Sequence, residues 1–260
     1  MTMDRTGPSS PIGMFDSGVG GLSVLGEAVR VLPGEDFIYY GDTANAPYGT
    51  KTRNEVCRLA FCVVDRLVEQ GVKAVVIACN TATAEAAMEL RAHYDFPIIG
   101  MEPALKPAAE MEGDGLRLVL ATPGTLGSEK YARLYARFGQ NAVSLPCPGL
   151  MEFVESGDRG SDELRTYLET LFAPYVSRKV TAVVLGCTHY SFIRPLIREY
   201  FPETTCILDG NAGTVRQLRR VLESRGWLGG TGQGKVTLQT SGSDTSLMLM
   251  HRMFEEARTL

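Results

Sequence analysis

The sequence predicts an α/β protein of two pseudo-symmetric lobes, each with a parallel sheet, and an active site in the cleft between them. Three observations support this. Short apolar runs alternate with stretches of helical periodicity, as in successive β–α–β units. The runs Ala74–Ala78 and Ala182–Leu185 are continuously apolar, which is typical of parallel strands covered on both faces. The order of elements in the first half also returns in the second half.

The predicted strands are short apolar runs bounded by glycine, proline or polar residues. In chain order they are Ile12–Phe15, Phe37–Tyr40, Ala74–Ala78, Phe96–Ile99, Leu116–Leu120, Ala142–Leu145, Ala182–Leu185, Thr205–Leu208 and Val236–Gln239. The helices predicted between and after them show apolar residues at helical spacing. These are Leu22–Leu32, Asn54–Gln70, Thr83–Tyr94, Gly127–Gly139, Asp162–Val176, Phe192–Tyr200, Ala212–Arg225 and Ser246–Ala257. Strands separated by helices imply right-handed crossovers and parallel pairing.

A weak internal repeat supports the two lobes. Ala74–Thr81 aligns with Ala182–His189 at an offset of 108 residues, and Phe15–Ser17 aligns with Leu120–Thr122 at an offset of 105. Any two strands rich in valine and isoleucine look alike, so chance resemblance is the alternative. Two matches in the same order favour lobes related by a pseudo-two-fold axis, which would bring Cys79 opposite Cys187.

The composition excludes several classes of protein. Of the 260 residues, 44% are apolar and 22% charged, as in ordinary globular proteins. The net charge of −4 argues against a nucleic-acid partner. No apolar run reaches the ~18 residues of a membrane span, and residues 1–10 lack the apolar core of a signal peptide. We therefore expect a cytoplasmic protein without membrane or nucleic-acid partners.

Six cysteines are expected to be free thiols in that compartment. With no Cys-x-x-Cys pair and three histidines, the sequence predicts no metal site. We interpret four cysteines as structural: Cys57, Cys62, Cys147 and Cys206. Cys79 and Cys187 differ, because each follows a buried strand and precedes a helix whose dipole favours a thiolate. Two opposed thiols are what a two-base racemase needs, one to remove a proton and one to return a proton to the other face.

The other residues at strand ends are polar, with hydroxyls and helix-start N–H groups that suit carboxylates. His189, two residues after Cys187, is predicted to be that thiol's proton partner. Asp16 has two open interpretations: a cap for the following helix, or a neighbour of Cys79. The stretch Gly18–Ser23 resembles a dinucleotide-binding turn, although Ser23 stands where glycine or alanine is expected. A tight turn approached by a small substrate explains the same glycines.

Five segments together carry a family resemblance. They are Phe15–Gly21, Tyr40–Thr43 with Pro47–Lys51, Ala78–Ala82, Ala121–Thr125 and Leu185–Tyr190. From Ile12 to the C-terminal helix, the chain resembles the glutamate racemases of the aspartate/glutamate racemase superfamily. Aspartate and hydantoin racemases belong to the same superfamily, but the Asp-Ser-Gly-x-Gly-Gly and Pro-Tyr-Gly pieces are similar to those of the glutamate enzymes.

The resemblance implies cofactor-free interconversion of L- and D-glutamate, which supplies peptidoglycan synthesis. It implies that Cys187 takes the α-proton of L-glutamate, assisted by His189, and that Cys79 takes that of D-glutamate, assisted by Asp16. The substrate would be held by Asp16, Ser17, Tyr48, Gly49, Asn80, Thr81, Thr122, Thr125, Glu152, Thr188 and His189. The implied lobes are residues 1–101 plus 211–260 and residues 102–210. One departure is Ser191, where the family usually has proline, so the loop that carries His189 is expected to be looser.

Three rival functions stay open at this point. The first is a related racemase acting on aspartate. The second is an NAD-dependent oxidoreductase, which would use the glycine turn but leave both cysteines unexplained. The third is a non-catalytic binder of acidic amino acids. None of the six lysines lies in a strand-end context that suits a pyridoxal cofactor, so no cofactor is expected. A homodimer stays open as the assembly.

Overall fold

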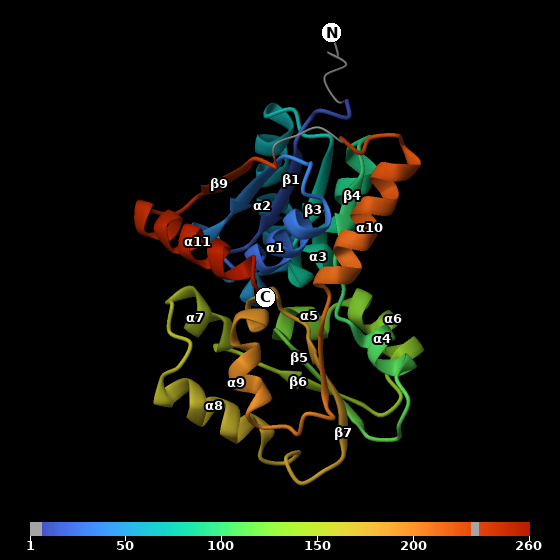
Figure 1. The fold of residues 1–260 in the computed structure, drawn as a ribbon, viewed down its shortest axis with the longest axis vertical. Coiled ribbons are helices and arrows are strands. Elements are labelled where there is room, and N and C mark those ends of the chain that lie inside the picture. Colours follow the sequence, from blue (N-terminus) through green and yellow to red (C-terminus); the bar gives the residue numbers. More distant parts are fainter. Residues whose placement is uncertain (1–6, 230–233) are drawn as a thin grey trace.

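The computed structural model describes residues 7–229 and 234–260. Residues 1–6, which belong to the segment 1–10 of the signal-peptide prediction, and residues 230–233 lie outside the described part. Two α/β lobes follow one another along the longest axis of the molecule (Figure 1). No helix in the described part is long and apolar enough to cross a membrane.

The sheet of the first lobe has five strands in the order β4-β3-β1-β2-β9, and all its neighbours pair in parallel. The strands are β1 (Ile12–Asp16), β2 (Phe37–Gly41), β3 (Ala74–Ile77), β4 (Ile98–Gly100) and β9 (Val236–Thr240). Strand β9 comes from the far end of the chain and pairs with β2, Tyr39 opposite Leu238. The C-terminal segment therefore completes this sheet.

The sheet of the second lobe has four parallel strands in the order β6-β5-β7-β8. They are β5 (Leu116–Ala121), β6 (Ala142–Pro146), β7 (Val180–Leu185) and β8 (Cys206–Asp209). Read backwards, this order matches β4-β3-β1-β2, with β7 in the place of β3 and β5 in the place of β1. The predicted α/β class with two pseudo-symmetric parallel lobes is confirmed.

Helices cover both faces of each sheet. In the first lobe, α1 (Leu22–Val31), α10 (Asn211–Ser224) and α11 (Asp244–Ala257) pack on one face, and α2 (Arg53–Glu69) and α3 (Asn80–His93) on the other. The first lobe also holds two short 3₁₀ turns, η1 (Thr43–Asn45) and η2 (Tyr48–Thr50). The second lobe holds α4 (Leu105–Glu110), α5 (Pro123–Gly127), α6 (Glu129–Phe138), α7 (Leu150–Glu155), α8 (Asp162–Phe172), η3 (Thr188–Ile193) and α9 (Arg194–Arg198).

The sequence predictions of helices were wrong in several places for local reasons. Helix α3 begins at Asn80 rather than Thr83, because the sulfur of Cys79 accepts the N–H of Ala82 at 3.4 Å and caps the helix. The predicted helix at 127–139 begins earlier and breaks at Ser128, whose hydroxyl caps α6. The predicted helix at 192–200 starts as the 3₁₀ turn η3. Helices α4 and α7 went unpredicted because six residues are too few to show a period.

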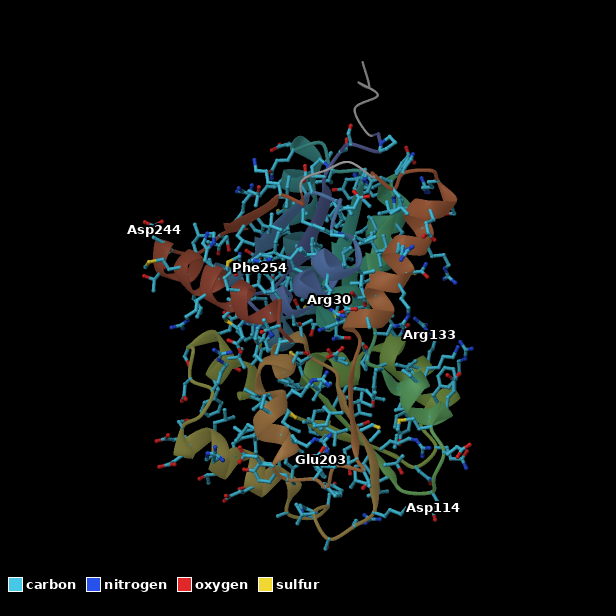
Figure 2. The ribbon with its side chains drawn as sticks, viewed as in Figure 1. Arg30, Asp114, Arg133, Glu203, Asp244 and Phe254 are labelled. Atoms are coloured by element: carbon cyan, nitrogen blue, oxygen red, sulfur yellow. The ribbon has the colours of Figure 1, made fainter. Side chains whose placement is uncertain are left out.

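One hydrophobic core runs through both lobes. It joins residues of β1 and β2 in the first lobe to residues of α7, α8 and η3 in the second. Figure 2 shows side chains filling the space where the two ribbons meet. The lobes therefore meet along a packed interface, at which the carboxyl ends of both sheets come together.

Candidate active site

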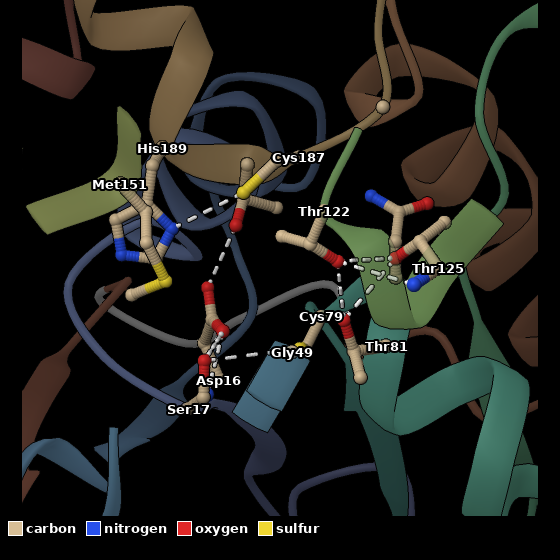
Figure 3. A pocket seen from close by; sticks show the side chains of 13 residues that line it. Asp16, Ser17, Gly49, Cys79, Thr81, Thr122, Thr125, Met151, Cys187 and His189 are labelled. Atoms are coloured by element: carbon tan, nitrogen blue, oxygen red, sulfur yellow. Dashed lines mark hydrogen bonds between the residues drawn. The ribbon is translucent and has the colours of Figure 1, made fainter. Parts of the chain in front are cut away.

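Cys79 and Cys187 lie at the carboxyl ends of β3 and β7, the equivalent strands of the two sheets. Both are buried, with 6% and 8% of their surface exposed, and both line one cavity between the lobes (Figure 3). Burial, reinforced by the nearby charge of Asp16, raises the pKa of Cys79 far above that of a free thiol. Charge on Cys187 acts in the same direction, so the two sulfurs influence one another.

The cavity is small and is lined by both polar and apolar groups. Its volume of about 10 Å³ is room for roughly one water molecule. The lining residues are Asp16, Ser17, Gly49, Cys79, Asn80, Thr81, Thr122, Thr125, Met151, Gly186, Cys187, Thr188 and His189. An amino acid is much larger than one water, so the cavity has to widen before such a ligand can enter.

A line of hydrogen-bonding groups lies behind Cys187. Its sulfur is 3.5 Å from Nδ1 of His189, and Nε2 of His189 is 2.6 Å from Oε1 of Glu155. Burial alone would lower the pKa of His189, but the Cys187 sulfur and the Glu155 carboxylate raise it well above its ordinary value. For Glu155, burial opposes ionisation, yet the contact with His189 leaves its pKa below the ordinary value. This arrangement favours an imidazolium that contacts the Cys187 sulfur on one side and an ionised Glu155 on the other.

A different line lies behind Cys79. Its thiol donates to Oγ of Ser17 at 3.9 Å, and that hydroxyl donates to Oδ1 of Asp16 at 3.1 Å. Burial raises the pKa of Asp16, although the charge of His189 and hydrogen bonds to its oxygens oppose the rise. Asp16 thus reaches Cys79 through a hydroxyl, whereas Glu155 reaches Cys187 through an imidazole.

Two sets of hydroxyl contacts join the lobes beside the cavity. Thr188 of the second lobe donates to Oδ2 of Asp16 in the first, at 2.8 Å. Oγ1 of Thr81 in the first lobe lies 3.1 Å from the hydroxyl oxygens of both Thr122 and Thr125 in the second. The predicted residues Asp16, Thr81, Thr122, Thr125 and Thr188 therefore meet around the two cysteines.

Asn80 carries the most informative polar side chain in the cavity wall. Its Nδ2 and Oδ1 are both buried and have no hydrogen-bond partner in the protein. Because unpaired buried amides are unfavourable, this side chain is suited to a polar ligand. It can offer both a donor and an acceptor.

Two predicted substrate residues do not line the cavity. The Tyr48 hydroxyl is buried and donates to Oδ2 of Asp42 at 2.6 Å, so its neighbour Gly49 provides the cavity wall. Glu152 is exposed on α7. The carboxylate that reaches the site is Glu155, three residues later on the same helix. Sequence reasoning missed Glu155 and Met151, because α7 itself was not predicted.

Ser191, which stands in place of the family's usual proline, lies buried in η3. Its hydroxyl donates to Oδ2 of Asp209 at 3.4 Å. The 3₁₀ turn that carries His189 is therefore continuous through this position.

The glycine turn after β1 faces the second lobe. A Cβ atom on Gly18 would lie 1.8 Å from Oε1 of Glu155, and one on Gly20 would lie 2.3 Å from Nδ1 of His189. The N–H of Val19 donates to Oε1 of Glu155 at 2.8 Å. The Val19 N–H, which a dinucleotide-binding turn would offer to a pyrophosphate, is occupied by the Glu155 carboxylate, and the His189 imidazole lies against Gly20. The structure thus argues against the oxidoreductase hypothesis.

No group of three or more histidine, cysteine, aspartate or glutamate side chains within residues 7–229 and 234–260 could hold a metal ion.

A model of the Asp/Glu/Hydantoin racemase family matches residues 17–218, and the chain belongs to this family. Its relatives include glutamate racemases. That of Clostridium botulinum (strain Hall) is 47% identical over 248 residues, 94% of this chain and 96% of the relative. That of Clostridium perfringens (strain 13) is 48% identical over 218 residues, 83% of this chain and 84% of the relative.

Solved glutamate racemases have the same fold. The Thermus thermophilus enzyme, in complex with β-chloro-D-alanine, has a TM-score of 0.81 at 33% identity, covering 95% of this chain and 94% of that one. The Escherichia coli enzyme, in complex with L-glutamate and the activator UDP-MurNAc-ala, has a TM-score of 0.83 at 29% identity, covering 95% of each chain. The family and fold indicated by the sequence are confirmed.

Proposed function

We propose that this protein interconverts L- and D-glutamate without a cofactor and supplies D-glutamate for peptidoglycan, with Cys79 and Cys187 as the two acid–base groups. One observation carries the proposal. Two buried thiols at equivalent strand ends line one cavity, and each has its own line of groups leading to a carboxylate. We choose glutamate as the substrate because glutamate racemases are similar to this chain over most of its length.

In the direction from L- to D-glutamate, the Cys187 thiolate takes the α-proton, so a C–H bond breaks and an S–H bond forms. The electron pair left on the α-carbon delocalises into the neighbouring carboxylate. The thiol of Cys79 then donates its proton to the opposite face, which gives D-glutamate and a Cys79 thiolate. The reverse reaction uses the same steps in the opposite order.

The surroundings of the two sulfurs differ before L-glutamate binds. Burial and Asp16 raise the pKa of Cys79, which favours the thiol, the acid for this direction. The contact of Cys187 with His189 provides a base that can accept the Cys187 proton. Before L-glutamate binds, Cys79 is therefore protonated and His189 is in contact with Cys187.

Hydrogen bonds in a site that excludes water stabilise the carbanion formed at the α-carbon of glutamate. Asn80 has unpartnered amide atoms in the cavity wall, and Thr81, Thr122 and Thr125 present hydroxyls beside it. We assign these groups, with Ser17, Gly49 and Thr188, to the substrate carboxylates and ammonium.

The test is a polarimetric assay with purified protein and L-glutamate, run in parallel with L-aspartate. We expect optical rotation to decay to zero with glutamate, and kcat/KM for aspartate to be far lower. Activity should survive dialysis against a chelator. Comparable kcat/KM values for the two substrates would favour a racemase of broader range, and an unchanged rotation with binding would favour a non-catalytic binder.

We also propose lobe boundaries of 1–101 plus 211–260 and 102–210. This division is supported by the strands, since β1–β4 and β9 fall in the first set and β5–β8 in the second. The chain crosses between the lobes near residues 101 and 210, which would act as the hinge when the cavity opens. Limited proteolysis in the presence and absence of glutamate would report on these segments.

A cytoplasmic location and a homodimer belong to the same proposal. All six cysteines are free, and free thiols persist in a reducing compartment. Cell fractionation tests the location. Light scattering after size exclusion tests the assembly, since a dimer has twice the 28.3 kDa of one chain.

A further inference from the structure

We propose that Tyr39 is a positioning residue for the Cys187 side of the reaction, acting through the peptide bond between Gly18 and Val19. The inference rests on the proposed function, because it concerns the groups that serve Cys187 as an acid and base. Tyr39 lies in the middle of β2 and does not line the cavity.

The evidence is an unbroken series of hydrogen bonds. The Tyr39 hydroxyl donates to the carbonyl oxygen of Gly18 at 2.8 Å. The N–H of the same peptide unit, belonging to Val19, donates to Oε1 of Glu155 at 2.8 Å. That oxygen is 2.6 Å from Nε2 of His189, whose Nδ1 is 3.5 Å from the sulfur of Cys187.

The peptide bond makes this series rigid. Since a trans peptide is planar, its C=O and N–H point in opposite directions, and fixing one fixes the other. The Tyr39 hydroxyl therefore sets the direction in which the Val19 N–H points. A hydrogen bond to the carbonyl also polarises the peptide, which strengthens the bond that its N–H makes to a carboxylate.

The packing leaves little freedom around this peptide. The Tyr39 side chain is fully buried, so its hydroxyl cannot turn to solvent. Glu155 lies so close to Gly18 that a Cβ atom there would be 1.8 Å from Oε1. The glycine thus allows direct contact between the carboxylate and the backbone that Tyr39 holds.

The series also crosses from one lobe to the other. Tyr39 and the glycine turn belong to the first sheet and its loops, whereas Glu155, His189 and Cys187 belong to α7 and the β7–η3 segment. The orientation of Glu155 against His189 is therefore completed only where the lobes are in contact. Tyr39 would support Cys187 in the closed enzyme and not in an open one.

The experiment compares Tyr39→Phe with the unaltered protein, using L-glutamate and D-glutamate deuterated at the α-carbon. Phenylalanine keeps the ring and removes only the hydroxyl. We expect kcat/KM to fall on the order of tenfold, as for one lost hydrogen bond. The fall should be equal in both directions, because the two enantiomers have equal free energies.

The isotope effects identify the step. Weaker support for Cys187 makes its proton transfer more rate-limiting. The primary deuterium isotope effect on kcat/KM should therefore rise for labelled L-glutamate and decline for labelled D-glutamate, whose proton Cys79 takes. A purely structural defect would leave the ratio of the two isotope effects unchanged, and that result would overturn the proposal.

Two further variants make the test specific. Tyr131→Phe removes another buried hydroxyl, which contacts Oγ of Ser144 at 2.6 Å away from this series, and should leave both isotope effects as they are. Glu155→Gln, alone and combined with Tyr39→Phe, completes a double-mutant cycle. Their effects on kcat/KM should be strongly non-additive if Tyr39 acts through Glu155. Simple additivity would contradict it.

A last variant covers poor folding of Tyr39→Phe. Gly18→Ala leaves the hydroxyl in place but displaces Glu155, and it should give the same isotope signature. If it does not, the proposal fails. Failure of the proposed function itself looks different, because the unaltered protein would then show no primary isotope effect with either labelled enantiomer.

Discussion

Cys79 and Cys187 hold nearly the same backbone conformation, with φ of −137° at both and ψ of 122° and 136°. Each is the residue that precedes a helical segment at the end of an equivalent strand, although 108 positions separate them in the chain. The backbone is thus nearly the same at the two cysteines, whereas the side chains that contact the two sulfurs differ. Serine and aspartate stand behind one sulfur, and histidine and glutamate behind the other.

The first prediction concerns the two thiols. Cys187→Ala should abolish racemisation, because no base is left on the L face. It should leave slow exchange of the α-proton of D-glutamate through Cys79 in D₂O. Cys79→Ala should give the mirror result, with exchange confined to L-glutamate. Proton NMR of the α-position measures the exchange, and optical rotation measures the racemisation.

The control for this prediction is Cys206→Ala, because Cys206 is exposed at the start of β8 and should leave activity unchanged. Racemisation above a trace in either Cys79→Ala or Cys187→Ala would show that one base serves both faces, which would falsify the two-thiol mechanism.

The second prediction concerns the glycine turn. Gly20→Ala should lower kcat by roughly 100-fold, because its Cβ would fall 2.3 Å from Nδ1 of His189 and push the imidazole from Cys187. Gly127→Ala is the matched control, since no atom lies within 4 Å of a Cβ there. Steady-state kinetics and thermal unfolding of both variants make the measurement. Equal activities would mean that the turn tolerates a side chain and that His189 adjusts.

The third prediction concerns Asp16 and pH. Burial raises its pKa, so the ionised carboxylate destabilises the folded state as the pH rises above its ordinary value of 3.8. Asp16→Asn removes that charge and keeps an acceptor for Thr188. Its Tm at pH 7.5 should exceed that of the unaltered protein, because no buried charge remains at this position. The gain should shrink as the pH is lowered towards 3.8.

The same Asp16→Asn variant should lose most of its racemase activity, because Ser17 no longer connects Cys79 to a carboxylate. A variant with a lower Tm than the unaltered protein at pH 7.5 would show that the ionised carboxylate is stabilising in place. Calorimetry across the pH range distinguishes these results.

The fourth prediction concerns a buried ion pair at the amino-terminal ends of β2 and β3. Nζ of Lys73 is 2.6 Å from Oε2 of Glu35, and both side chains are almost fully buried. Lys73→Met leaves Glu35 without its partner, which should cost about 3–5 kcal/mol of stability. That corresponds to a Tm lower by roughly 10 °C.

The Lys73→Met variant should keep its activity at temperatures below its lowered Tm, because Lys73 does not line the active-site cavity. Lys179→Met is the control, since Lys179 pairs with Asp114 on the surface with 72% of its side chain exposed and should leave Tm almost unchanged. Similar melting curves for the two variants would contradict a stabilising role for the buried pair.

Several features of this protein were predictable because their causes are local. The apolar run Ala74–Ile77 is a parallel strand, and a strand covered on both faces is expected to lack polar residues. Polar residues directly after parallel strands meet at one edge of the sheet, because the carboxyl ends of all these strands lie there. The sequence therefore predicted that Cys79, Asp16 and Ser17 lie close together. Short helices were not predictable in this way. Cys79 and Ser128 cap helices α3 and α6, so these helices begin at other residues than helical periodicity alone predicts.

By itself, the sequence determined the fold class, the family and the strand-end positions of Cys79 and Cys187, because hydrophobic periodicity and short motifs depend on neighbours in the chain. Tertiary structure alone decided which glutamate of α7 reaches His189, since Glu152 and Glu155 differ only in how that helix is set against η3. It also decided the role of Gly18 and Gly20, which admit groups from the other lobe. A turn that could bind phosphate and a turn that receives a carboxylate have the same glycines. What lies opposite them, more than 130 residues away in the chain, depends on how the lobes pack.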